Sequence, residues 1–297
     1  MTTIRPATAH DLAEIQHIFY LNEIQGAADP PPPPTGIPLL YQHIVQTGTL
    51  YVAEQDGRIY GYAGAITRGN ITYLTDLFVH SEVQSSHLGT TLLQHTLPPV
   101  EQSIRCTMSS TDYRALALYI RAGMQPQWPH FNLRLTQPAH DARWQSPIEI
   151  SEVEENDADA VVQWDARIGG RMRPQEHLYW RQRQRAVPLW FRYQGQVIGY
   201  GYVRLGAGTL WYPNACTIGP LSVNAPEHAT DCVLGAIGWA LQHAAAVIRI
   251  DVPGPHPCLA PLLERGFHIV YVETFVSNAS SPFFDANCYI ASGSDLL

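Results

Sequence analysis

The sequence predicts an α/β fold made of two halves in tandem, and three observations support this prediction. The chain has 297 residues, which is long enough for two domains. Its content of 45% apolar and 15% charged residues is typical of a globular protein with a core. The hydrophobic spacing switches between helical and strand periods, and the predicted elements follow the same order in both halves, as a tandem duplication would give.

The first half begins with a strand at residues 2–6, followed by a helix at 10–24 that places Leu12, Ile15 and Ile18 on one face. Five prolines at 30–34 end this helix, and we interpret them as a stiff connector, with a ligand for a partner as the alternative. The further elements are a helix at 38–46, a hairpin at 49–66, a strand at 70–80, a helix at 85–97, a strand at 103–109, a helix at 112–122 and strand material to 135.

The polar, proline-interrupted residues 136–147 are typical of a linker. We therefore expect domains at 1–138 and 147–297, joined by a linker at 139–146. The second half predicts a strand at 148–153, a helix at 157–167, a hairpin at 190–204, a strand at 209–223, a helix at 231–246, a strand at 247–252, a short helix at 257–265 and a strand-like tail.

Charge and cysteine usage disfavour several function classes. The chain has 18 basic residues, all Arg, against 26 acidic ones, and a net charge of −8 disfavours binding to nucleic acid. The apolar-leaning run at 232–248 is too short and too polar to span a membrane, and no signal peptide is evident. Five scattered cysteines predict reduced, buried thiols, so we expect a cytoplasmic protein. No metal-binding motif is present.

Two motifs in the first half point to a ligand site. The strand ending in LFVH (77–80) runs into the turn QSSHLGT (84–90), which opens an apolar helix. Such a joint directs free backbone N–H groups and the positive end of a helix at an anion such as a phosphate. The second motif, D-x-x-A-x-x-L-Y-x-x-x-G at 112–123, follows the next strand directly.

Together these motifs resemble the GNAT superfamily of N-acetyltransferases, over about residues 2–136. The resemblance implies two tandem GNAT-like domains, each a mixed, largely antiparallel central sheet flanked by helices, with a degenerate C-terminal copy. It also implies acetyl-CoA as co-substrate, whose pyrophosphate binds the turn. The implied cofactor-binding residues are Leu77, Phe78, Val79, Gln84, Ser85, Ser86, His87, Leu88, Gly89, Thr90, Asp112 and Tyr119.

The sequence departs from the superfamily pattern at three positions. His87 stands where the first glycine is expected, and glycine there lets the backbone approach a phosphate without a Cβ. His87 either donates a hydrogen bond to the phosphate or weakens cofactor binding. Asp112 replaces Asn and can still cap its helix, and Met124 replaces Phe.

Acetyl transfer from a thioester to an amine requires a neutral amine, a stabilised oxyanion and a protonated thiolate. Tyr119 matches the superfamily tyrosine that protonates the thiolate, and packing of its ring is the alternative role. Backbone N–H groups at 77–79 would polarise the thioester carbonyl.

The candidate base is Asp76, which lies two residues from Phe78 and thus on the same strand face. It either takes a proton, directly or through water, or holds a cationic amine, and structural capping or a surface charge is its alternative role. Tyr73 and Glu23 are alternative candidates for the base. Thr75 stands where relatives resembling diamine acetyltransferases have Glu, so a polyamine acceptor is not implied.

The second half is expected to keep the fold and to have lost cofactor binding. Its turn at 225–231 has no glycine and carries Glu227 and Asp231, whose charge is wrong for a pyrophosphate. Leu262 occupies the tyrosine position. Seven arginines lie within 167–192; we interpret them as a solvated segment, with an anion or partner site as the alternative.

The sequence thus predicts an acetyl-CoA-dependent N-acetyltransferase that acts on a small-molecule amine or a peptide amino group by direct transfer, as a monomer or homodimer. One alternative is a tandem enzyme similar to mycothiol synthase, in whose family the C-terminal half is active. The other is an inactive acyl-CoA-binding sensor or scaffold.

Overall fold

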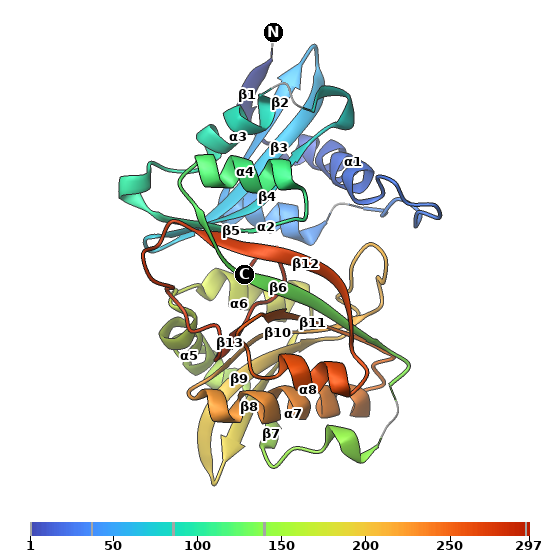
Figure 1. The fold of residues 1–297 in the computed structure, drawn as a ribbon, viewed down its shortest axis with the longest axis vertical. Helices are drawn as coiled ribbons and strands as arrows, with labels where there is room; N and C mark the ends of the chain where they lie inside the picture. The colour runs from blue at the N-terminus through green and yellow to red at the C-terminus, as the bar shows by residue number, and fades with distance from the viewer. Residues whose placement is uncertain (1, 37, 85–86, 139–140, 295) are drawn as a thin grey trace. The chain divides into compact units, whose positions relative to one another are not determined.

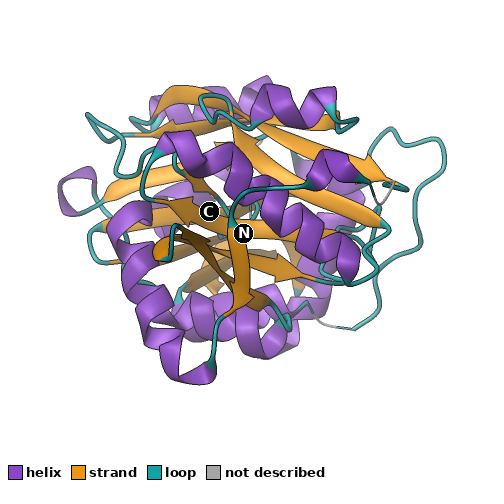
Figure 2. Cartoon of the chain, turned by 90° about the horizontal axis from the view of Figure 1, so that it is seen from below, coloured by secondary structure: helices purple, strands orange, loops and turns teal. Residues whose placement is uncertain are grey.

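The computed structural model describes residues 2–36, 38–84, 87–138, 141–294 and 296–297. The chain divides into two compact units, Met1–Thr107 and Met108–Leu297. In both units the helices lie against the strands (Figures 1 and 2).

The first unit alternates helices and strands. Its elements are β1 (Thr3–Pro6), α1 (Leu12–Glu23), α2 (Leu39–Thr47), β2 (Thr49–Gln55), β3 (Arg58–Arg68), β4 (Ile71–Val79), α3 (Leu88–Thr96) and β5 (Ile104–Ser109), with 3-10 turns at Ala9–Asp11, Ser81–Val83 and Val100–Gln102.

The strands of the first unit are ordered β1-β2-β3-β4-β5. All neighbours are antiparallel except β4 and β5, which run parallel and pair only through Ile71–Tyr73. Asp56 and Gly57 have φ of 53° and 79°, which gives the β2–β3 hairpin the tight turn that its sequence predicts.

Helices cover both faces of this sheet. Leu92 of α3 packs against Ala53 and Ala63 on one face. Tyr62 precedes Ala63 in β3 and therefore points to the other face, where its ring meets Tyr41 of α2. The face that carries Tyr62 is the one that holds the candidate acids.

The second unit repeats this order of elements after α4 and β6. Its elements are α4 (Tyr113–Arg121), β6 (Gln125–Thr136), β7 (Glu149–Glu152), α5 (Ala158–Gly169), α6 (Pro174–Arg183), β8 (Val187–Tyr193), β9 (Gln196–Arg204), β10 (Cys216–Val223), α7 (Ala229–Gln242), β11 (Val247–Pro253), α8 (Leu259–Glu264), β12 (His268–Ser277) and β13 (Tyr289–Ile290), with 3-10 turns at Ala142–Trp144, Glu155–Asp157 and Pro226–His228.

The strands of the second unit are ordered β12-β6-β11-β10-β9-β8-β7, and β13 pairs with β10. Again one pair, β10 and β11, is parallel, and the other neighbours are antiparallel. The buried apolar side of α7, including Val233 and Ile237, packs on this sheet together with Ile218 and Ile248. The mixed, largely antiparallel sheets confirm the predicted fold class.

Strand β6 accounts for the position at which the compact units divide. It pairs with β11 along one edge and with β12 along the other, so its contacts lie in the second unit. The repeat in the sequence predicts domains at 1–138 and 147–297, whereas the compact units meet at residue 107. Sequence domains and compact units are therefore different divisions of this chain, and the predicted linker at 139–146 stays a prediction.

The interpretation of the arginine-rich segment as solvated is wrong for its first part. Residues 174–183 form α6, and Arg171 and Arg173, just before it, are only 6% and 2% exposed. Arg173 is buried because Asp165 of α5 accepts its Nε at 2.6 Å and its Nη2 at 2.9 Å. A buried arginine requires such a partner.

All five cysteines are buried and free, as the sequence predicts. None of the helices within the described residues is long and apolar enough to cross a membrane.

Candidate functional site

The end of β4 departs from regular strand geometry. Ala65 pairs with Leu74 and Gly64 with Asp76, so Thr75 is an extra residue on β4. Such a bulge twists the strand locally and is common beside active sites. It lies where β4 has already parted from β5, because their pairing ends at Tyr73.

The predicted cofactor turn connects β4 to α3. Gln84 donates from Nε2 to the carbonyl oxygen of Val79 and to Oδ1 of Asn22, both at 3.4 Å, which fastens the turn to β4 and α1. His87 is exposed and adopts φ of 64°, a left-handed conformation that glycine adopts more readily. Ser85 and Ser86 lie outside the described residues.

Helix α3 begins directly after His87, whose carbonyl accepts the N–H of Thr91 at 3.1 Å. The N–H groups of the first helical turn, Leu88 to Thr90, have no acceptor within an α-helix. They and the positive end of the helix dipole form a surface suited to an anion. Gly89 is half-buried within this turn.

Asp76 and Phe78 share the sheet face that α1 covers. The ring of Phe78 meets Phe19 of α1 edge-on, with centroids 5.5 Å apart. Nδ2 of Asn22 donates to the carbonyl of Val79 at 3.4 Å, so the last turn of α1 is joined to the end of β4. Glu23 lies one helical turn beyond Phe19 and therefore on the same side of α1.

Two tyrosines that the sequence analysis did not identify lie beneath these acids. Tyr62 pairs across the strands with Phe78, stacks on its ring at 5.6 Å, and is fully buried. Its hydroxyl lies 2.6 Å from that of Tyr41. Burial, Tyr41 and the charges of Asp76 and Glu23 raise the pKa of Tyr62 well above its usual value. Both carboxylates therefore disfavour ionisation of the buried Tyr62 hydroxyl.

The two acids differ in accessibility. Asp76 is 8% exposed. Glu23 is exposed as a residue, yet protein atoms crowd its carboxyl group, and this desolvation raises its pKa. The third candidate, Tyr73, is only 2% exposed on β4. The geometry therefore groups Asp76 and Glu23 on one face of the first unit.

Asp112 and Tyr119 lie on α4, in the second unit. Asp112 caps the helix as expected, accepting the N–H of Arg114 at 2.8 Å. Arg114 also forms an ion pair with this carboxylate, which lowers the pKa of Asp112. Tyr119 is 5% exposed, and Met124, which follows the helix, is fully buried.

In the second unit, a buried ion pair between Asp165 and Arg173 lies on the sheet face that corresponds to the acid-bearing face of the first unit. Tyr200 holds the position of Tyr62, since it pairs with Ser222 of β10 as Tyr62 pairs with Phe78 of β4. Its hydroxyl donates to Asp165 at 2.5 Å. Burial alone would raise the pKa of Asp165, but Arg173 and His177 together lower it. This carboxylate is fully buried and remains ionised.

The prediction of a degenerate second copy depends on Glu227, Asp231 and Leu262. Glu227 is exposed in the 3-10 turn before α7, and Asp231 is half-buried in its first turn. Leu262 is fully buried on α8 and belongs to the core. An aliphatic core side chain has no proton to donate.

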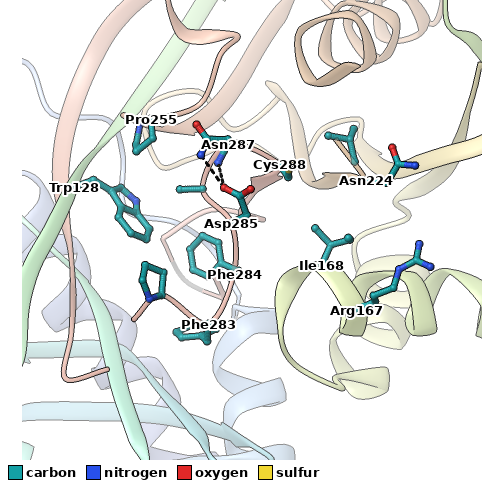
Figure 3. A pocket seen from close by; sticks show the side chains of 13 residues that line it. Trp128, Arg167, Ile168, Asn224, Pro255, Phe283, Phe284, Asp285, Asn287 and Cys288 are labelled. Carbon is teal, nitrogen blue, oxygen red and sulfur yellow. Dashed lines mark hydrogen bonds between the residues drawn. The ribbon is translucent and has the colours of Figure 1, made fainter. Parts of the chain in front are cut away.

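A pocket of about 610 Å³ lies in the second unit, between α5, the end of β10 and the loop at 282–288 (Figure 3). Trp128, Phe283 and Phe284 supply aromatic walls, and Asp285 accepts hydrogen bonds from the backbone and side-chain N–H groups of Asn287 at 2.9 and 2.8 Å. Of the predicted site residues that the structure describes, none lines this pocket. Within the described residues, no group of three His, Cys, Asp or Glu side chains is arranged to hold a metal ion.

Comparison with known proteins agrees with these features. Residues 46–125, which span both motifs, match the family model of the acetyltransferase (GNAT) domain. No curated protein sequence matches the chain.

Solved structures resemble the chain over its whole length. A candidate acetyltransferase of Pyrococcus horikoshii is 17% identical with a TM-score of 0.75, covering 99% of this chain and 95% of that one. A GCN5-related N-acetyltransferase of Sphaerobacter thermophilus is 16% identical, with a TM-score of 0.64 and coverage of 96% and 97%. A tandem GNAT protein from the clavulanic acid biosynthesis pathway is also 16% identical, with a TM-score of 0.63 and coverage of 95% and 99%. Residues 46–125 thus match the acetyltransferase (GNAT) domain, and the fold of almost the whole chain is similar to that of a tandem GNAT protein.

Proposed function

We propose that the protein is an acetyl-CoA-dependent N-acetyltransferase that transfers the acetyl group directly to a small-molecule amine or a peptide amino group. The observation that carries this proposal is the match of residues 46–125 to the GNAT domain, together with the bulged end of β4 and the turn that opens α3. These are the parts of the chain that the chemistry requires.

The cofactor is proposed to bind with its pyrophosphate at the turn 84–90, and Gly89 allows the backbone to approach it. Backbone N–H groups at 77–79 would polarise the thioester carbonyl. These strand residues lie beyond the point where β4 and β5 stop pairing. The strand edge there is therefore suited to an extended ligand.

The two acids are proposed to act in sequence on the acceptor. Glu23, the more exposed, attracts the ammonium form of the amine, and Asp76, next to the bulge, takes the proton. The neutral nitrogen then attacks the carbonyl carbon, the C–S bond breaks, and Tyr119 donates its proton to the departing thiolate. The nitrogen, which is positively charged after the attack, releases its second proton to water to give the amide, and Tyr119 regains a proton from water. A phenol with a pKa of about 10 can protonate a thiolate whose thiol has a pKa of about 8.5 once the two groups are held together.

Turnover of acetyl-CoA with a panel of amines and peptides tests this function, with thiol release and product mass as the readouts. Because the chain contains no Lys, an acetylated lysine in the assay must come from the added acceptor. We expect thiol release that depends on an amine. Binding of acetyl-CoA without acetylation of any acceptor would instead indicate the sensor or scaffold function.

A further inference from the structure

Strand β10 has different neighbours along its two edges. β9 pairs with it from Thr217 to Val223 on one edge. On the other edge, β11 pairs with Cys216–Ile218 only. Beyond that point β13 takes over, since Ile290 pairs with Leu221 and Tyr289 with Ser222. The N–H of Val223 donates to the carbonyl of Cys288 at 2.9 Å.

Within the described part of the first unit, the corresponding edge of β4 has no such strand. β3 pairs with β4 along its full length, and β5 pairs with Ile71–Tyr73 only. By strand register, residues 77–79 correspond to 221–223, because Gly61 pairs with Val79 as Gly199 pairs with Val223. Among the described residues of the first unit, no strand lies along this edge from Asp76 to Val79.

The segment that fills the β10 edge is tightly held. Tyr289, Ile290, Ala291 and Ser292 are each at most 2% exposed. Arg204 of β9 donates to the carbonyl of Ser292. The backbone of Ala291 approaches Gly219 so closely that a Cβ at that glycine would overlap the Ala291 carbonyl oxygen.

Further along, the last residues are fixed by buried arginines. Arg171 donates to the main-chain oxygen of Leu297 at 2.9 Å, and Arg173 donates to that of Leu296 at 3.3 Å. The hydroxyl of Tyr289 donates to Leu297 at 3.1 Å. Side chains of the second unit therefore hold the strand segment at Tyr289 and Ser292 and the residues beyond it at Leu296 and Leu297.

We propose that residues 288–292 are an internal ligand of the second unit. They bind by strand addition to the edge of β10 that corresponds to the proposed cofactor edge of β4, so an extended ligand such as the pantetheine arm of acetyl-CoA is excluded there. The comparison between the two edges rests on the proposed function. The exclusion is independent of the charges of Glu227 and Asp231, because it acts through backbone groups that are already paired.

Hydrogen exchange of the full chain, with and without acetyl-CoA, tests this proposal. We expect the amides at 221–223 and 288–290 to be protected and unchanged by acetyl-CoA, while those at 77–79 gain protection. Loss of protection at 288–290 on adding acetyl-CoA would overturn the inference. No change at 77–79 would count against the proposed function instead, so the two failures are distinguishable.

A pair of variants examines the coupling between the segment and the strand. Arg204→Met removes a charged donor to Ser292, and we expect exchange at 221–223 and 288–292 to accelerate together, on the order of 10- to 100-fold. Arg265→Met is the matched control, since Arg265 donates to the carbonyls of Arg143 and Pro261 instead. If exchange accelerates at 288–292 but not at 221–223, the segment does not protect the edge of β10 and the inference is wrong.

Calorimetric titration separates blockage by the segment from repulsion by the acids. The full chain and the double variant Glu227→Gln with Asp231→Asn should each bind one acetyl-CoA. A second bound acetyl-CoA in the double variant, with 288–292 still protected, would overturn the inference. In that case charge alone would be the obstacle in the second unit.

Discussion

Tyr119 combines a packed ring with the hydroxyl that the proposed reaction uses. Tyr119→Phe keeps the ring, which is 5% exposed, so the fold should persist. Loss of a general acid lowers the rate by about 10²- to 10⁴-fold. We expect this loss in kcat, with an unchanged Kd for acetyl-CoA in calorimetry. A decrease of less than about threefold, with chemistry still rate-limiting, would make Tyr119 structural.

Substitutions of Asp76 and of Glu23 should affect different kinetic constants. Asp76→Asn removes the proposed proton acceptor, so kcat should fall by about 10²-fold or more. Glu23→Gln should mainly raise the KM for the amine. The KM of the native enzyme should also rise as the pH falls, because Glu23 loses its charge on protonation and its raised pKa brings that loss nearer neutrality.

The kcat and the KM for the amine are measured as functions of pH for both variants and for the native enzyme. If Glu23→Gln lowers kcat as much as Asp76→Asn while the KM stays constant, Glu23 is the base and the assignment is reversed.

His87 replaces a glycine of the superfamily turn at a position where the backbone is left-handed. Its φ of 64° suits glycine, and glycine would also remove the Cβ at the proposed phosphate site. We expect His87→Gly to bind acetyl-CoA more tightly in calorimetry. Weaker binding would show instead that the imidazole donates a hydrogen bond to the phosphate.

At the scale of elements, the joint between β4 and α3 carries the proposed cofactor site. Gly89→Val places a branched side chain on its first helical turn, where it should block backbone approach and weaken acetyl-CoA binding at least about tenfold. Valine has a higher helix propensity than glycine, so α3 should not be lost. Gln94→Val, on the exposed side of the same helix, is the matched control. Equal affinities of the two variants would contradict the assignment.

Most elements could be predicted because their signal is local. The alternation in the hairpins and the apolar spacing of α7 depend only on neighbouring residues. Helix α6 could not be predicted in this way. Its buried His177 and the preceding Arg173 are hydrogen-bonded to Asp165 of α5, and the sequence does not indicate that these residues meet. The same limit applies to the site: Asp76 follows from a motif, whereas Tyr62 and Tyr41 meet only through tertiary packing.

At the scale of the whole molecule, two buried imidazoles link stability to pH. Burial lowers the pKa of His130 and of His256 to about 3. In the unfolded chain both titrate near 6.5, so between pH 6.5 and 3 the unfolded state binds more protons. The free energy of unfolding should therefore fall as the pH is lowered through this window, by at most about 1.4 kcal/mol per pH unit for each imidazole.

Denaturant unfolding at pH 7, 5.5 and 4.5 measures this dependence. His130→Gln and His256→Gln should each have a shallower slope than the native chain, since each removes one titrating group. If the unfolding free energy of the native chain stays constant between pH 6.5 and 4.5, the pKa values of the two imidazoles are not lowered in the folded protein.

The position of β6 has an evolutionary consequence. This strand follows the GNAT motifs in the sequence, yet it is hydrogen-bonded on both edges, to β11 and to β12. A gene cut at the predicted linker, 139–146, would encode a first half whose β6 has lost both partner strands and a second half with two facing strand edges left unpaired. Bare edges of this kind promote aggregation. We therefore expect the two sequence halves of this chain to be encoded together in one gene.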